Sequence, residues 1–267
     1  MFSRSVRLGL ALAVSCVFAP VPSALAQATA TQAPATTPAP ADAALPAAQT
    51  VIDRHLEATG GRKVLEKQNS VAIKGSISIP ANGMTGTVAI SAARPNKTLV
   101  NSTIAGIGEV SEGFDGTVAW SMNPMTGPML ATGEELAQKA FDADFDRSLG
   151  IAQKYEAMKT IEKTTFEGRP VYRLELTRKM GGTDIEFYDV ETGLKAGSII
   201  ERTNPMGKIS ATTALSDYKK FGDTLQPTVM KQTVSGVQII TTFTSVEFNK
   251  VDPAMFELPA AIKALIK

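Results

Sequence analysis

From Ser70 onward the chain alternates apolar and polar residues, and this period of two continues through most of the sequence. Between residues 71 and 79, valine and isoleucine alternate with alanine, lysine and serine, as do side chains on the two faces of a strand. Asn82-Gly83 then supplies the positive φ that a tight turn needs, before a second alternating run at 87–92. The pattern predicts an antiparallel hairpin.

Further segments with the same alternation are predicted strands: 97–104, 108–114, 117–122, 155–166, 170–178, 184–190, 194–203, 208–218, 226–234 and 238–248. Short connections such as Gly181-Gly182 and Ser235-Gly236 separate most of them. Strands joined so closely pair antiparallel, because parallel pairing needs a long crossover. Tyr172, Leu174 and Leu176 alternate with polar residues, so we expect one covered face and one solvated face.

Three segments have the period of a helix instead. Residues 47–60 and 62–68 predict two N-terminal helices, and 133–150 predicts an inserted amphipathic helix with apolar residues every four positions. Asp142, Asp144 and Asp146 resemble the start of a calcium loop, but arginine occupies its sixth position and glutamine its twelfth. We therefore expect these aspartates on a solvated helix face. The elements together predict an α+β fold, a sheet of about 10–12 strands covered by helices.

Residues 1–26 have the layout of a cleaved signal peptide. A basic start and an apolar stretch at 8–21 precede Ala24-Leu25-Ala26, which predicts cleavage before Gln27 and a periplasmic location. The apolar stretch is too short to span a membrane. The alternative is a lipoprotein anchored through Cys16. Residues 27–46, rich in alanine, proline and threonine, predict a disordered tether, and 47–267 predict one domain.

The composition excludes several kinds of chemistry. The chain has one histidine, His55, and one cysteine, which leaves too few soft ligands for a metal centre and only His55 as the base of a catalytic triad. The 27 Lys+Arg against 26 Asp+Glu give no basic surplus for nucleic acid. Gly106-Ile107-Gly108 lacks the third glycine of a dinucleotide loop. We expect no cofactor, and we expect His55 to pack on the apolar side of the first helix.

The segment 120–130 concentrates soft apolar residues. It holds the single tryptophan, Trp120, with Met122, Met125 and Met129 beside prolines and a glycine. Methionine adapts to irregular apolar shapes. Two interpretations stay open: these residues fill the core beneath the inserted helix, or they line the mouth of a cavity for an acyl chain.

Several short motifs resemble the periplasmic lipoprotein carriers of the LolA/LolB-like superfamily, and in particular its lipoprotein-sorting-like members. The match covers roughly residues 47–260 and begins with a helix that stops at Gly60-Gly61, followed by the isoleucine-rich hairpin. The other motifs are Arg94-Pro95-Asn96-Lys97, Gly113-Phe114-Asp115-Gly116, Ala119-Trp120, Asn123-Pro124, Phe187-Tyr188-Asp189, Glu191-Thr192-Gly193-Leu194, Asp217-Tyr218 and the ending from Val251-Asp252-Pro253 to Phe256-Glu257-Leu258-Pro259. The resemblance implies a strongly curved, incomplete antiparallel barrel with a hydrophobic cavity for lipid groups. It does not assign the gating arginine of the carriers to Arg54, Arg62 or any other position.

The expected function is to hold a lipid, or the acyl chain of a lipoprotein, between the curved sheet and the helices. The expected partners are that lipid and an envelope protein, with peripheral membrane contact and a monomeric state. The residues predicted to line the cavity are Ile73, Ile77, Val88, Ile90, Phe114, Trp120, Met122, Met125, Met129, Phe141 and Phe145. Two alternatives stay open: an interaction or sensor module with a filled core, and a carboxylate-dependent hydrolase on the same scaffold. The expected lipid-binding function involves no enzyme activity.

Overall fold

The computed structural model describes residues 44–204 and 207–266, and its strands form one 13-stranded antiparallel sheet. The strands are β1 (Ser70–Ile79), β2 (Met84–Ala93), β3 (Lys97–Ile104), β4 (Gly108–Phe114), β5 (Ala119–Asn123), β6 (Gly127–Leu130), β7 (Tyr155–Phe166), β8 (Arg169–Arg178), β9 (Thr183–Asp189), β10 (Lys195–Asn204), β11 (Gly207–Phe221), β12 (Thr224–Val234) and β13 (Val237–Phe248). The helices are α1 (Ala48–Ala58), α2 (Arg62–Leu65), α3 (Gly133–Asp142), α4 (Ile151–Lys154) and α5 (Ala260–Lys263), with short 3₁₀ turns η1 (Pro80–Asn82) and η2 (Pro253–Phe256).

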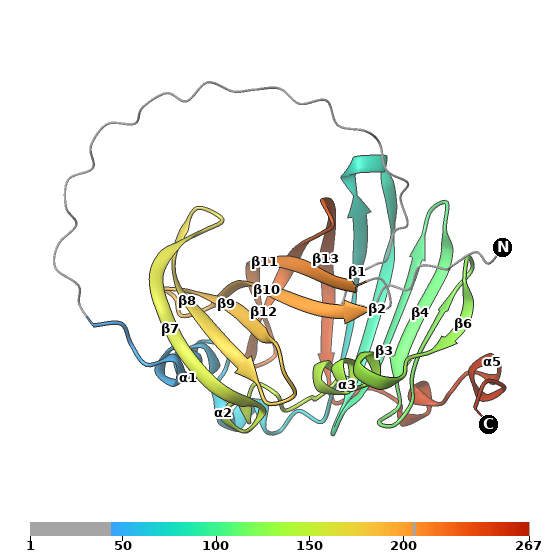
Figure 1. The fold of residues 1–267 in the computed structure, drawn as a ribbon, viewed down its shortest axis with the longest axis horizontal. Helices are drawn as coiled ribbons and strands as arrows, with labels where there is room; N and C mark the ends of the chain where they lie inside the picture. The colour runs from blue at the N-terminus through green and yellow to red at the C-terminus, as the bar shows by residue number, and fades with distance from the viewer. Residues whose placement is uncertain (1–43, 205–206, 267) are drawn as a thin grey trace.

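The sheet consists of two meanders. Strands β1 to β6 follow one another across one half and β7 to β13 across the other, and the pairing of β1 with β13 joins the halves. Strands β6 and β7 are the two edges, so the sheet does not close on itself. It bends strongly, with β7 at one side of the molecule and β6 at the other (Figure 1). This is the incomplete barrel that the family resemblance implies.

Breaks in register accompany the bending of the sheet. The pairing shifts between Lys74 and Gly75 in β1, and between Lys195 and Gly197 in β10. An extra residue on one strand increases its local twist and bends it. Gly75 allows a close approach there, because a Cβ at this position would lie 2.3 Å from the Thr242 carbonyl oxygen. These shifts help a single sheet to wrap around a central space.

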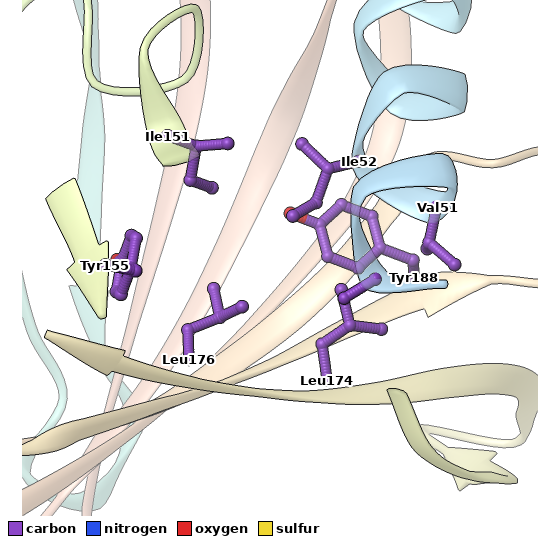
Figure 2. Close-up of a cluster of buried hydrophobic side chains, with 8 residues drawn as sticks. Val51, Ile52, Ile151, Tyr155, Leu174, Leu176 and Tyr188 are labelled. Carbon is purple, nitrogen blue, oxygen red and sulfur yellow. The ribbon is translucent and has the colours of Figure 1, made fainter. Parts of the chain in front are cut away.

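One part of the core joins α1 to the β7–β9 side of the sheet. Figure 2 shows Val51 and Ile52 of α1 above Leu174 and Leu176 of β8, with Tyr188 of β9 between them. Both leucines are fully buried. The period of 3.6 in the helix and the period of two in the strand each place their apolar residues at this contact. The predicted first helix and its apolar face are therefore confirmed.

The segment between β6 and β7, residues 131–154, crosses the concave face of the sheet, and we refer to it as the lid segment. Its helix α3 lies low across the middle of the molecule in Figure 1. Leu136 and Ala140 of α3 pack against a buried cluster that contains Phe114 of β4. The inserted helix thus covers the sheet as predicted.

The predicted length of this helix is wrong. It ends at Asp142, and turns occupy most of the stretch before α4 begins at Ile151. The Asp144 side chain accepts a hydrogen bond from the backbone N–H of Asp146 at 3.1 Å, which holds a turn in place of a further helical turn. The N–H of Phe145 donates to the carbonyl of Pro95 at 3.0 Å, so tertiary contacts also compete with the helix.

Two other expectations need correction. Strand β6 was not predicted, so the sheet exceeds the expected range of strands by one. The outer face near β7–β10 is also not simply polar, because Val171, Phe187 and Ala196 form a second buried cluster there. Val171 and Leu174 lie on opposite faces of β8, and both are fully buried.

The signal peptide and nearly all of the tether fall within residues 1–43 and so lie outside the described residues. In the part of the chain that is described, no helix has the length and hydropathy needed to cross a membrane.

Candidate functional site

A cavity of about 260 Å³ lies between the lid segment and the concave face of the sheet. Residues from β2, β3, β4, β9, β10, β11 and β12 form its floor and sides, and α3 and the turn after it form its cover. Pockets for small ligands usually hold about 300–1,000 Å³. In this conformation the cavity therefore matches a small ligand or one short chain.

One wall of the cavity is apolar. Its side chains come from five strands and from the lid segment: Ile90, Val100, Phe114, Ala143, Ile200 and Met230. Ile90 and Phe114 are also buried core residues, at 7% and 4% exposure. An apolar ligand group in contact with this wall would be removed from water, which is favourable.

Of the predicted lining residues, the structure brings Ile90 and Phe114 to this wall, and Phe145 to a second cavity described below. Ile73, Ile77 and Val88 do not line the cavity but pack in the cluster that joins Ile90 to β13, and Phe141 packs against the α1 cluster.

The tryptophan-methionine segment lies on β5, β6 and their connection. Trp120 is buried against Gly113, where a Cβ would approach the indole ring to 2.8 Å. Met122 and Met129 are half-buried, and Met125 at the β5–β6 turn is 68% exposed. None of these four residues lies in the lining of either cavity.

Another part of the lining, which we call the ionic wall, is charged, which the sequence did not predict. Seven charged residues line the cavity: Glu112, Lys139, Asp142, Arg147, Asp184, Glu186 and Lys195. Asp142, at the end of α3, accepts hydrogen bonds from Arg147 at 3.0 Å and from Arg202 of β10 at 2.8 Å. The bond from Arg202 joins the lid segment to the sheet, and the bond from Arg147 lies within the lid segment.

Asp184 of β9 extends this network. Its carboxylate accepts a hydrogen bond from the Tyr155 hydroxyl at 2.9 Å and lies 3.4 Å from Arg202 and 3.5 Å from Arg178. The side chains of Asp184 and Arg178 are only 5% and 3% exposed. Burial and the neighbouring Asp184 carboxylate raise the pKa of the Tyr155 hydroxyl, so Tyr155 is a neutral donor at physiological pH.

Two carboxylates in the lining have lysine partners. Glu112 of β4 accepts a hydrogen bond from Lys139 of α3 at 3.1 Å, and Glu186 of β9 pairs with Lys195 of β10. Burial raises the pKa of the Glu112 carboxyl, and Lys139 offsets part of that effect. Burial alone would raise the pKa of Glu186 too, but Lys195 and hydrogen bonds from Lys195 and Tyr188 outweigh it and lower that pKa.

A second cavity of about 230 Å³ lies beneath α1 and α2 and also reaches Lys195. His55 lines it, and its Nδ1 accepts a hydrogen bond from the Lys195 backbone N–H at 3.2 Å. The ring also packs edge-on against Tyr188, with centroids 5.4 Å apart. Burial, with a smaller effect of Lys195, lowers the pKa of His55 to about 4. His55 therefore packs as a neutral side chain on α1, as the sequence predicts.

The acidic residues of the lid segment do not form the solvated helix face that we expected. Asp142 pairs with two arginines, Asp144 pairs with Lys154, and Asp146 lies 2.7 Å from Arg94. The pairs with Arg202 and Arg94 attach the lid segment to the rest of the molecule, and the pairs with Arg147 and Lys154 join residues within it. Among the described residues, no group of three or more histidine, cysteine, aspartate or glutamate side chains could hold a metal ion.

Sequence reasoning missed the ionic wall because its members lie on different strands. One local signal existed, in β9, where Asp184 and Glu186 alternate with Ile185 and Phe187. We expected the apolar residues of such a strand to face the helices. In the structure Asp184 and Glu186 face the cavity, while Ile185 and Phe187 join the outer cluster.

Comparison with solved structures identifies the architecture. A LolA superfamily protein from Nitrosomonas europaea aligns over 80% of this chain and 99% of its own, with a TM-score of 0.53 and 13% sequence identity. The fold is LolA-like. A DUF1329 family protein from Desulfovibrio piger aligns over 79% of this chain and 97% of its own, with a TM-score of 0.52 and 12% identity. Neither a family profile nor a curated protein sequence matches the chain.

The resemblance drawn from short motifs is therefore correct at the level of fold. Identities of 12–13% show a shared architecture and leave the ligand of this chain to be argued from its own residues. In this LolA-like fold, the ligand-sized space lies where the lid segment faces the bent sheet.

Proposed function

We propose that this protein is a periplasmic carrier of the lipoprotein-sorting type, which holds an apolar chain between its lid segment and its sheet. The observation that supports this most is the cavity with its apolar wall of Ile90, Val100 and Phe114. We further propose that the protein is exported, is cleaved before Gln27 and works in the periplasm. There it is proposed to be a monomer. Its partners there are a lipid or lipoprotein acyl chain and an envelope protein.

The physical basis is the free energy of burying methylene groups, about 0.8 kcal/mol for each. A chain that enters the cavity removes its own apolar surface and that of the wall from water. The cavity volume of about 260 Å³ suits a single short chain in the present conformation. A lipoprotein with several acyl chains needs the lid segment to open further.

The test is displacement of an apolar fluorescent dye from delipidated protein. Ile200→Asp places a charge in the apolar wall and is expected to weaken dye binding at least tenfold, about 1.4 kcal/mol. Ile161→Asp is the matched control, because Ile161 lies on β7 and is 39% exposed. Circular dichroism checks that both variants fold.

Val100→Thr supplies a milder variant should Ile200→Asp not fold, because it exchanges a methyl group for a hydroxyl at almost constant volume. It is expected to weaken dye binding in the same direction. Unchanged affinity in folded variants at both positions contradicts the proposal.

A carboxylate-dependent hydrolase is the second candidate, and one observation favours it. The pKa values of Glu112 and Glu186, which line the same cavity, shift in opposite directions, as those of an acid and a base do. Against it, each carboxylate has a lysine partner. Ester hydrolysis that disappears in Glu112→Gln and Glu186→Gln supports the hydrolase, and its absence in the parent protein excludes that reaction.

A further inference from the structure

The ionic wall of the cavity, taken together with two arginines that bond to it, carries an excess of positive charge, although the seven charged lining residues alone comprise three cations and four carboxylates. Its four carboxylates are Glu112, Asp142, Asp184 and Glu186. Lys139 and Lys195 pair with the two glutamates, one each. The two aspartates are shared among three arginines: Arg147, Arg178 and Arg202. With Tyr155 and His55 neutral, the group has one cation more than it has anions.

Arg147 is the arginine of this group that a ligand can reach. Arg178 and Arg202 have side chains only 3% and 10% exposed, and neither belongs to the cavity lining. The Arg147 side chain is 33% exposed and does line the cavity. Its guanidinium carbon lies 5.3 Å from the centre of the Phe141 ring, which orients the group.

The hydrogen-bonding capacity of Arg147 is incompletely used. A guanidinium has five N–H donors. Within the described residues, the hydrogen bond made by this side chain is the one from Nη1 to Asp142 at 3.0 Å. Arginine binds carboxylate and phosphate groups through paired N–H donors, in geometry that matches their oxygens. Arg147 therefore offers donors and charge for one anionic group inside the cavity.

The apolar wall lines another part of the same cavity. Val100 and Phe114 come from β3 and β4, and Ile200 and Met230 come from β10 and β12. A ligand that satisfies both walls has a charged end and an alkyl end. The volume of about 260 Å³ limits it to one short chain.

We propose that the cavity binds a single-chain amphiphile with one anionic head group, a carboxylate or a phosphate, whose oxygens accept hydrogen bonds from Arg147 while its chain lies on the apolar wall. This inference rests on the proposed function and adds the class of ligand. Fatty acids and monoalkyl phosphates share this chemistry. Neutral lipids with the same chain lack the head group and are expected to bind more weakly.

Three probes of equal chain length test the inference: decanoate, decyl phosphate and decanol. Titration calorimetry near neutral pH measures their affinities for delipidated protein. We expect one or both anionic probes to bind at least about tenfold more tightly than decanol, the effect of a charge-assisted hydrogen bond. The comparison of decanoate with decyl phosphate identifies the head group.

Arg147→Gln keeps a hydrogen-bond donor and removes the charge. It is expected to abolish the preference for the anionic probes and to leave the decanol affinity within about twofold. Arg173→Gln is the matched control on the surface, where Arg173 pairs with the half-exposed Glu162. Asp142→Asn supplies a second variant if Arg147→Gln does not fold. It frees Arg147 and is expected to increase the preference.

The outcomes separate the two proposals. Equal binding of all three probes by the parent protein overturns the anionic head group and leaves the lipid-binding function intact. No binding of any probe contradicts both. A preference that persists in folded Arg147→Gln, or that falls in Asp142→Asn, overturns the assignment to Arg147.

Discussion

Arg94 lies in the connection between β2 and β3 and bonds to the lid segment and to residues that follow α2 or end it. Its replacement tests how much these contacts stabilise the protein. Its Nη2 lies 2.7 Å from the Asp146 carboxylate of the lid segment. The guanidinium also donates to the backbone carbonyls of Glu66 at 2.9 Å and Leu65 at 3.4 Å. It lies 5.6 Å from the centre of the Phe145 ring.

We predict that Arg94→Met destabilises the protein by about 2 kcal/mol. The ion pair itself contributes only about 0–1 kcal/mol, because Asp146 is 44% exposed. The hydrogen bonds to carbonyl groups contribute about 0.5–1.5 kcal/mol each, and the contact with Phe145 about 0.5–1 kcal/mol. Methionine retains part of the apolar packing. The predicted loss of about 2 kcal/mol is therefore smaller than the sum of the upper limits of these contributions.

Urea unfolding followed by circular dichroism measures this change, and a thermal scan is expected to show a lower Tm by about 4–8 °C. Arg173→Met is the control, because Arg173 lies 3.5 Å from a half-exposed glutamate on the surface. It is expected to change stability by less than about 0.5 kcal/mol. Equal stability of the two variants would refute the role of Arg94.

Three further predictions concern other parts of the chain. Leu174→Ala is expected to cost about 2–5 kcal/mol in urea unfolding, since Leu174 is fully buried, whereas Leu265→Ala, 41% exposed, changes little. His55 has a pKa lowered to about 4, so the unfolded state takes up its proton first as pH falls below 6.5. Stability is then lost between pH 6.5 and 4, by up to about 3 kcal/mol, and His55→Asn removes that loss, as pH-dependent unfolding can show. N-terminal sequencing of the exported protein is expected to begin at Gln27, and a lipid-modified Cys16 contradicts the cleaved signal peptide.

The strands were predictable because their signal is local. Alternation at 71–79 and the Asn82-Gly83 turn fix β1, β2 and the turn between them without help from the rest of the chain. Strand β6 was missed because Gly127-Pro128-Met129-Leu130 shows no alternation, and its pairing with β5 forms only in the sheet. The end of α3 was missed for a similar reason, since the contact between Phe145 and Pro95 is tertiary.

The site was less predictable than the fold. Apolar residues were expected to line it, and Ile90 and Phe114 do so. The charges were not expected, because alternation tells which residues of a strand share a face and does not tell which face is inside. Asp184 and Glu186 face inward, since two arginines and a lysine from the neighbouring strands β8 and β10 compensate for their burial. Such compensation depends on residues far apart in the sequence.

We propose that the cavity beneath the lid segment holds an apolar chain. Native mass spectrometry of protein isolated directly from the periplasm tests it most directly, with Ile200→Asp measured beside the parent protein. We predict a non-covalent adduct with the mass of a single-chain lipid on the parent protein, lost on delipidation and reduced in the folded variant. Parent protein that carries no adduct when freshly isolated, and acquires none from added decanoate, decyl phosphate or decanol, would contradict the account and favour a module with a filled core.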